Sequence, residues 1–190
     1  AACLVARRVG ILFGDLHVAE RVDHLCRRVG LLDLDRVRTN ARRVGAYARE
    51  HGLAWRPHIK THKSLEVAGI QLEAGARGLT VATLREAEVM SGLTDDLLLA
   101  YPPVGAAKLD RLVRLPATVD LKVALDSAEV LDALADATAG AGRTVSVLVE
   151  ADVGLGRVGV GAYNELSQIY PGKLMGMDQN PKKIKCFREE

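Results

Sequence analysis

The sequence predicts an α/β fold in which short parallel strands alternate with helices. Strand-like apolar segments begin near residues 31, 55, 79, 97, 119 and 144, so one β/α unit recurs about every two dozen residues. Segments with helical spacing, each about 10–15 residues long, separate these strands. Residues 97–101 are almost continuously apolar, which is typical of a strand buried on both faces of a parallel sheet. About six right-handed units of this kind predict either a doubly wound sheet or a barrel.

The composition is that of a globular domain. With 190 residues, 48% hydrophobic and 26% charged, the chain is long enough to bury a substantial core. The net charge of +2, from 26 basic and 24 acidic residues, is too balanced to predict nucleic-acid binding. Three cysteines lie far apart and predict neither a disulfide framework nor a zinc module (Cys3, Cys26 and Cys186). No apolar run reaches membrane-spanning length, and arginines interrupt residues 4–13, so we expect no membrane partner and a cytoplasmic location.

The first two predicted units cover residues 31–75. A short strand at residues 31–35 precedes an amphipathic helix at 36–51, which ends at Gly52. A second strand is predicted at 55–60. Ser64 is the expected N-cap of a helix that runs to residue 74 and stops at Gly75.

The next four units are more regular. Strands at 79–83 and 97–101 precede helices at 84–91 and 105–115. A strand at 119–125 leads to Ser127, which is expected to cap the helix at 128–139. The sixth strand, at 144–151, runs into a glycine-rich segment at 154–159.

Both ends of the chain differ from this pattern. Residues 1–30 are arginine-rich without firm periodicity and form an atypical N-terminal segment. Beyond residue 161, the composition shifts from arginine to lysine, since 17 of the 18 arginines precede it. We therefore expect a barrel domain at residues 31–161 and a divergent tail at 162–190. Two explanations of the tail remain open: a solvated terminus, or a departure of the coding sequence from its ancestral frame.

Lys60 is the main candidate for a reactive side chain. Pro57 favours an extended backbone, in which His58, Lys60 and His62 would share one face. Partial burial and neighbouring positive charge would favour the neutral amine, which can form a Schiff base. The alternative interpretation is an exposed basic turn. Two histidines without a third ligand do not predict a metal site.

The glycine-rich segment offers a second candidate. Residues 154–159 fit the G-x-G-x-x-G pattern of dinucleotide binding, but they follow the sixth strand and no clear acidic strand end comes after them. The alternative is a loop that projects Arg157 from the carboxyl end of a strand, where barrels place functional groups. Several other strand-end residues could line a pocket or serve in capping and packing (Thr83, Tyr101, Asp126 and Asp152).

Several segments, taken in order, carry a family resemblance. They are Leu-Asp-Leu-Asp-Arg-Val at 32–37, Arg-Pro-His-Ile-Lys-Thr-His-Lys at 56–63, Thr-Val-Ala-Thr at 80–83, Asp-Asp-Leu-Leu-Leu-Ala-Tyr-Pro at 95–102, and Glu-Ala-Asp-Val-Gly-Leu-Gly-Arg-Val-Gly-Val at 150–160. Together they resemble the D-threonine aldolase and D-serine dehydratase group. These are pyridoxal-phosphate enzymes with an alanine-racemase-like N-terminal domain. The resemblance runs from about residue 31 to residue 160.

The resemblance implies a fold and a site. The fold would be a partial (β/α)8 barrel of about six units. Lys60 would hold pyridoxal phosphate, Arg157 would face the pyridine nitrogen, and His58 and His62 would lie beside the cofactor. Complete members of the group also have a C-terminal β domain with a divalent metal site, whose ligands are not recognisable here.

The resemblance also implies an activity. We expect a pyridoxal-phosphate-dependent lyase of the D-threonine aldolase type, which would convert the small molecule D-threonine to glycine and acetaldehyde, in a chain that could form homodimers. Three alternatives remain open: a D-serine dehydratase, a fragment without activity, and a non-catalytic protein that carries pyridoxal phosphate.

Overall fold

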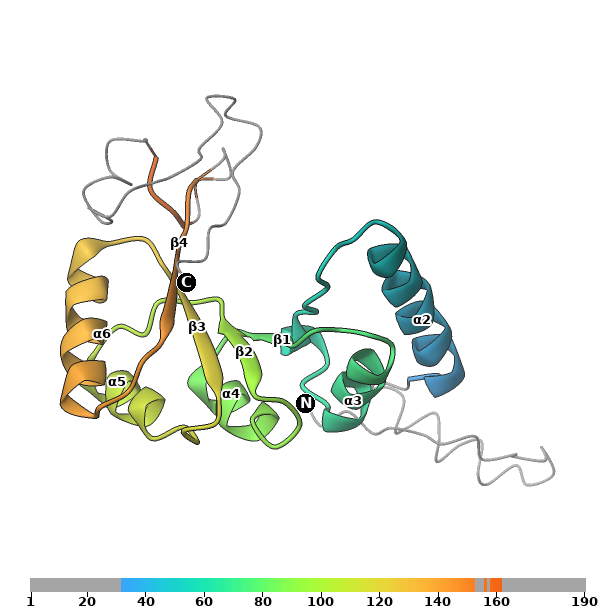
Figure 1. The fold of residues 1–190 in the computed structure, drawn as a ribbon, viewed down its shortest axis with the longest axis horizontal. Coiled ribbons are helices and arrows are strands. Elements are labelled where there is room, and N and C mark those ends of the chain that lie inside the picture. The colour runs from blue at the N-terminus through green and yellow to red at the C-terminus, as the bar shows by residue number, and fades with distance from the viewer. Residues whose placement is uncertain (1–31, 153–155, 157, 162–190) are drawn as a thin grey trace, which may run out of the picture. The chain divides into compact units, whose positions relative to one another are not determined.

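The computed structural model describes residues 32–152, 156 and 158–161. The chain divides into two compact units, Ala1–Leu79 and Thr80–Glu190 (Figure 1). The expectations for residues 1–30 and 162–190 lie outside the described residues.

The first unit begins with α2 (Leu34–Glu50). The Asp33 carboxylate accepts hydrogen bonds from the backbone N–H groups of Asp35 and Arg36, at 3.0 and 3.2 Å, and so caps the helix. The strand predicted at residues 31–35 is therefore wrong for residues 32–35, because residues 32 and 33 belong to no strand and the cap places Leu34 and Asp35 in the first helical turn. The predicted helix is confirmed, and it starts two residues earlier than expected.

The C-terminal end of α2 is a Schellman motif. Gly52 has a φ of +63°, which favours glycine. Its N–H donates to the Arg49 carbonyl at 3.3 Å, and the Leu53 N–H donates to the Ala48 carbonyl at 2.7 Å. The predicted helix end at Gly52 is thereby confirmed.

α2 packs against α3 (Leu65–Glu73) within the first unit. Leu34, Ala41 and Ile70 form the buried centre of this contact, and three partly buried side chains surround it (Val37, Trp55 and Ala74). A Cβ atom at Gly45 would overlap the Ala74 carbonyl oxygen. Glycine at this position therefore permits the close approach of α2 to the end of α3.

Between the two helices the predicted strand at 55–60 is replaced by a short 3-10 helix, η1 (Ile59–Thr61). The Trp55 carbonyl accepts one hydrogen bond from the Arg77 N–H at 2.9 Å, but residues 53–58 contain only an isolated bridge at His58. Pro57 has no N–H with which to extend a ladder. The strand prediction here is wrong.

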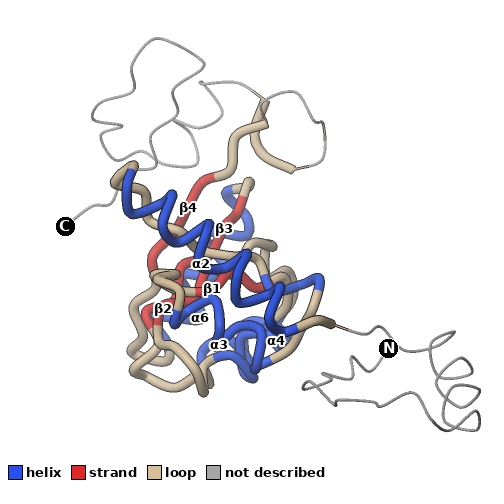
Figure 2. Tube along the Cα trace, turned by 90° about the vertical axis from the view of Figure 1, so that its right-hand side faces the viewer, coloured by secondary structure: helices blue, strands red, loops and turns tan. Residues whose placement is uncertain are grey.

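The sheet contains four strands in the described part of the chain: β1 (Leu79–Val81), β2 (Asp96–Leu99), β3 (Asp120–Leu125) and β4 (Ser146–Val149). They are hydrogen-bonded in the order β1-β2-β3-β4. β2 pairs with β3, and β3 pairs with β4, both in parallel. Strands β3 and β4 lie side by side in Figures 1 and 2. A doubly wound sheet reverses its strand order, whereas a barrel keeps it sequential. The sequential order confirms the barrel-type α/β fold, with four strands in place of the expected six.

Three helices connect the strands: α4 (Leu84–Met90), α5 (Ala106–Val113) and α6 (Ala128–Gly140). Their caps follow the sequence. The Thr83 hydroxyl accepts from the Glu86 N–H at 3.2 Å, and the Ser127 hydroxyl accepts from the Val130 N–H at 3.4 Å. Ser127 and Thr83 are thus confirmed as helix caps.

Alternate residues of β2 and β3 form the core of the second unit. Leucine and valine side chains on one face of these strands are almost fully buried, together with leucines of α5 and α6 (Leu97, Leu99, Leu121, Val123, Leu125, Leu112 and Leu134). This burial stabilises the sheet and fixes the register in which β2 and β3 pair. Among the residues described, no helix has the length and hydrophobicity needed to cross a membrane.

Candidate functional site

Lys60 lies in the middle of η1, and its side chain is exposed. The preceding Ile59 is fully buried and anchors the turn in the first unit. The His58 side chain is the N-cap of the turn, because its Nδ1 accepts a hydrogen bond from the Lys60 N–H at 3.4 Å. The backbone of Lys60 is therefore held on one side while its amine extends into solvent.

The expectation that His58, Lys60 and His62 share one extended face is wrong. A 3-10 helix has about three residues per turn, so residues two apart point in different directions. Lys60 is exposed, whereas His62 is partly buried. The partial burial expected for Lys60 is likewise absent.

His62 serves as a structural group. Its Nδ1 accepts a hydrogen bond from the Ser64 N–H at 3.1 Å. Burial lowers the pKa of the His62 imidazole. The neutral imidazole therefore joins the Lys60 turn to the first turns of α3.

The segment between this imidazole and α3 is conformationally restricted. Lys63 has a φ of +49°, which costs a residue with a side chain about 1–3 kcal/mol. Its N–H donates to the Ile59 carbonyl at 2.8 Å. The Ser64 hydroxyl then accepts from the Val67 N–H at 3.3 Å and caps α3, as predicted.

The second unit places three carboxylates near the carboxyl ends of β3 and β4: Asp126, Glu150 and Asp152. Burial raises the pKa of the Glu150 carboxyl, and the negative charge of Asp126 raises it further. Such a carboxyl holds a proton at higher pH than an exposed one and is suited to proton exchange. Glu150 was not singled out from the sequence as a site residue, although a carboxylate that directly follows an apolar strand is a recognisable signal.

The glycine-rich segment folds back onto the strand that precedes it. Ala151 and Val160 form a parallel bridge. The Asp126 carboxylate accepts a hydrogen bond from the Gly159 N–H at 3.0 Å, and both oxygens of Asp152 accept from the Gly156 N–H, at 3.0 and 3.1 Å. The two aspartates therefore fix the turn through backbone contacts that need no ligand.

Gly159 also has a steric role in this turn. Its φ is +98°, and a Cβ atom there would lie 2.6 Å from the Ala151 carbonyl carbon. Close backbone packing thus accounts for this glycine of the G-x-G-x-x-G pattern. Arg157 lies outside the described residues, so its expected place beside the cofactor remains a prediction.

Tyr101 follows β2 and is 58% exposed, so the described structure does not use it in the core. No group of three histidines, cysteines, aspartates or glutamates in the described residues is arranged to hold a metal ion.

A family model described as alanine racemase, N-terminal domain, matches residues 32–174. A D-threonine aldolase from Arthrobacter sp is 40% identical over 132 residues, which are 68% of this chain and 35% of the relative. A 3-hydroxy-D-aspartate aldolase from Paracoccus denitrificans is 37% identical over 133 residues, which are 68% of this chain and 34% of the relative.

The solved structures agree with these matches. The crystal structure of a D-threonine aldolase from Filomicrobium marinum superposes with a TM-score of 0.69 and 33% identity, covering 73% of this chain and 38% of that one. The chain therefore spans about a third of the length of these relatives.

Proposed function

The chain belongs to the alanine racemase N-terminal domain family, and we propose that it carries the cofactor-attachment part of a pyridoxal-phosphate-dependent lyase for D-β-hydroxy amino acids. D-Threonine is the proposed substrate, because a D-threonine aldolase is among the relatives and the structural neighbours. The observation that carries the proposal is the presentation of Lys60 on a capped, anchored turn.

The residues of this turn fit the cofactor. Lys60 offers an exposed primary amine on a flexible stem, which is what attachment of an aldehyde requires. The buried Ile59 and the His58 cap hold its backbone in place. When bound, pyridoxal phosphate would supply an electron sink for cleavage of the Cα–Cβ bond.

The chain's own groups would orient the reactants and move protons. Loss of acetaldehyde from D-threonine requires a base that takes the proton of the β-hydroxyl group. His62 does not suit this role, because its imidazole is partly buried and its Nδ1 is occupied by the Ser64 N–H.

Attachment can be tested by mapping the modified lysine. The protein is incubated with pyridoxal phosphate, reduced with borohydride, digested and examined by mass spectrometry. We expect the reduced label on Lys60 and its loss in Lys60→Gln. Lys63→Gln is the matched control, since it removes another exposed lysine three residues away. Equal labelling of wild type and Lys60→Gln would contradict the proposal.

Two observations favour alternative functions. A D-threo-3-hydroxyaspartate dehydratase from Delftia sp. is also similar, at 37% identity, which favours dehydration as the second candidate reaction. The exposed amine of Lys60 would also suit a non-catalytic carrier of pyridoxal phosphate, since attachment of the cofactor does not require turnover.

These functions differ in their products. The loaded protein is given D-threonine and D-serine in separate reactions. Acetaldehyde and glycine from D-threonine would support the aldolase, and pyruvate and ammonia from D-serine would support the dehydratase. Labelling of Lys60 without turnover of either substrate would identify a carrier.

A further inference from the structure

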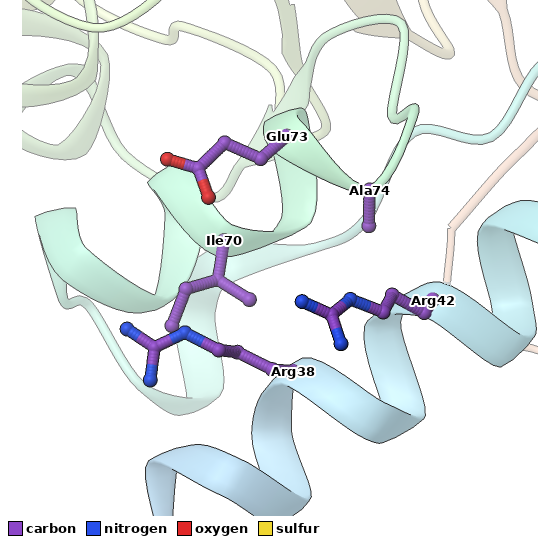
Figure 3. Close-up of a pocket in the computed structure, with 5 residues that line it drawn as sticks. All are labelled: Arg38, Arg42, Ile70, Glu73 and Ala74. Carbon is purple, nitrogen blue, oxygen red and sulfur yellow. The ribbon is translucent and has the colours of Figure 1, made fainter.

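A pocket of about 220 Å³ lies between α2 and α3, within the first unit. Arg38 and Arg42 line it from α2, and Ile70, Glu73 and Ala74 line it from α3 (Figure 3). A water molecule takes up about 30 Å³ of the liquid, so the pocket has room for a small organic molecule.

The charged groups of this pocket are not used by the fold. In the part of the chain that the structure describes, Arg38, Arg42 and Glu73 form no ion pair, whereas Arg36 on the same helix pairs with Asp33 at 3.4 Å. Arg38 and Arg42 are four residues apart and therefore lie on the same face of α2. Two guanidinium groups and one carboxylate are thus available to a ligand.

The apolar part of the pocket comes from α3. Ile70 is only 6% exposed, and in Figure 3 the Arg42 guanidinium points toward it and toward Ala74. Ile70 and Ala74 offer a surface for a short aliphatic group, while Glu73 is exposed at the rim.

We propose that this pocket binds a free α-amino acid with a small aliphatic side chain. The carboxylate of the ligand would pair with Arg38 and Arg42, whose planar guanidinium groups match carboxylate geometry. Its ammonium group would pair with Glu73, and its side chain would rest on Ile70 and Ala74. A simple anion would leave Glu73 unmatched, and a simple cation would face two arginines, so the zwitterion fits the charges best.

This site is separate from the proposed attachment of a cofactor at Lys60. Because Arg42 and Glu73 are exposed, their ion pairs are weakened by solvent, and we expect affinity in the millimolar range. A bound ligand would link α2 to α3, the helix that begins directly after the Lys60 turn.

The test is a titration of the full chain, without pyridoxal phosphate, followed by NMR chemical shifts. Alanine is compared with propionate, which lacks the ammonium group, and with ethylamine, which lacks the carboxylate. We expect alanine to bind about tenfold more tightly than either analogue. The double variant Arg38→Gln/Arg42→Gln should weaken alanine binding by about tenfold. Glu73→Gln should bind alanine and propionate equally.

A double variant of arginines outside the pocket, Arg36→Gln/Arg43→Gln, removes the same charge from α2 and is the matched control. It should bind alanine like the wild type, and so should Lys60→Ala. The proposal is overturned if propionate or inorganic phosphate binds the wild type as tightly as alanine, or if the control variant loses as much affinity as the pocket variant. Loss of alanine binding in Lys60→Ala would also overturn it, by placing the ligand at the cofactor lysine. Absence of lysine labelling would by contrast affect only the proposed function.

Discussion

The Nδ1 atom of His62 accepts a hydrogen bond from the backbone N–H of Ser64 at 3.1 Å. This contact joins the end of the Lys60 turn to the cap of α3, so the helix and the turn form one continuous structural element. His62 therefore supports the turn that carries Lys60, and its expected place beside the cofactor stays a prediction.

Replacing His62 by asparagine should change how stability depends on pH. Burial lowers the pKa of His62 in the folded state. Near and below about pH 6.5, the His62 imidazole is therefore protonated more readily in the unfolded chain than in the folded one. Stability therefore falls as the pH drops from about 6.5 toward the lowered pKa. Asparagine keeps an acceptor for the Ser64 N–H and does not titrate, so His62→Asn should flatten this part of the curve.

Urea unfolding at a series of pH values measures this effect. His51→Asn is the control, because His51 is exposed at the end of α2. An unchanged slope in His62→Asn, or an equal flattening in His51→Asn, would contradict the structural role of the buried imidazole.

Gly159 and Gly156 should respond differently to alanine. Both have positive φ values, of +98° and +61°, so a side chain costs about 1–2 kcal/mol at either position. Only at Gly159 would the Cβ atom collide with the backbone of Ala151 and Asp152, whereas nothing lies within 4 Å at Gly156. Gly159→Ala should therefore lower the free energy of unfolding by clearly more than Gly156→Ala, as measured by urea denaturation. Equal losses would show that the bridge to Val160 is not rigid.

Arg143 should be important for the stability of the second unit. Its guanidinium donates to the Leu115 carbonyl, to the Pro116 carbonyl at 3.3 Å and to the Val119 carbonyl at 3.2 Å. Loss of these charged hydrogen bonds in Arg143→Ala should cost about 2 kcal/mol in urea unfolding. Arg114→Ala is the comparison. Among the described residues Arg114 makes only an exposed ion pair with Asp110, so its loss should cost less than about 1 kcal/mol.

Glu150→Gln should stabilise the protein at neutral pH. The pKa of Glu150 is raised in the folded state, so the proton is bound more tightly there than in the unfolded chain. The stability that this proton provides is complete below the ordinary carboxyl pKa and is lost as the pH rises through the raised one. The neutral amide avoids this loss, and the gain should vanish below about pH 4.3.

Thermal unfolding of wild type and Glu150→Gln across this range checks the prediction. Glu129→Gln, on the exposed first turn of α6, should show no comparable gain at neutral pH. A destabilised Glu150→Gln at pH 7 would show that the charged carboxylate has a favourable partner.

Much of the second unit could be predicted from sequence because its signals are local. The strands from residue 79 onward are short apolar runs, and Ser127 stands directly before the helix that it caps. The same applies to Ser64 and to the glycine at the end of α2. The wrong strand prediction at residues 31–35 could also have been avoided from local sequence, because aspartate, here Asp33, is a common helix N-cap.

The sequence by itself determined the order of the β/α units from residue 79 onward, because helix caps and hydrophobic period act within a few residues. The choice of Lys60 as the candidate cofactor lysine came from the family resemblance. The tertiary structure alone decided that Gly45 admits the Ala74 carbonyl, that the His62 imidazole is partly buried, and that Asp126 acts on the charge of Glu150. Burial and charge proximity depend on residues far apart in the chain, and only folding brings those residues together.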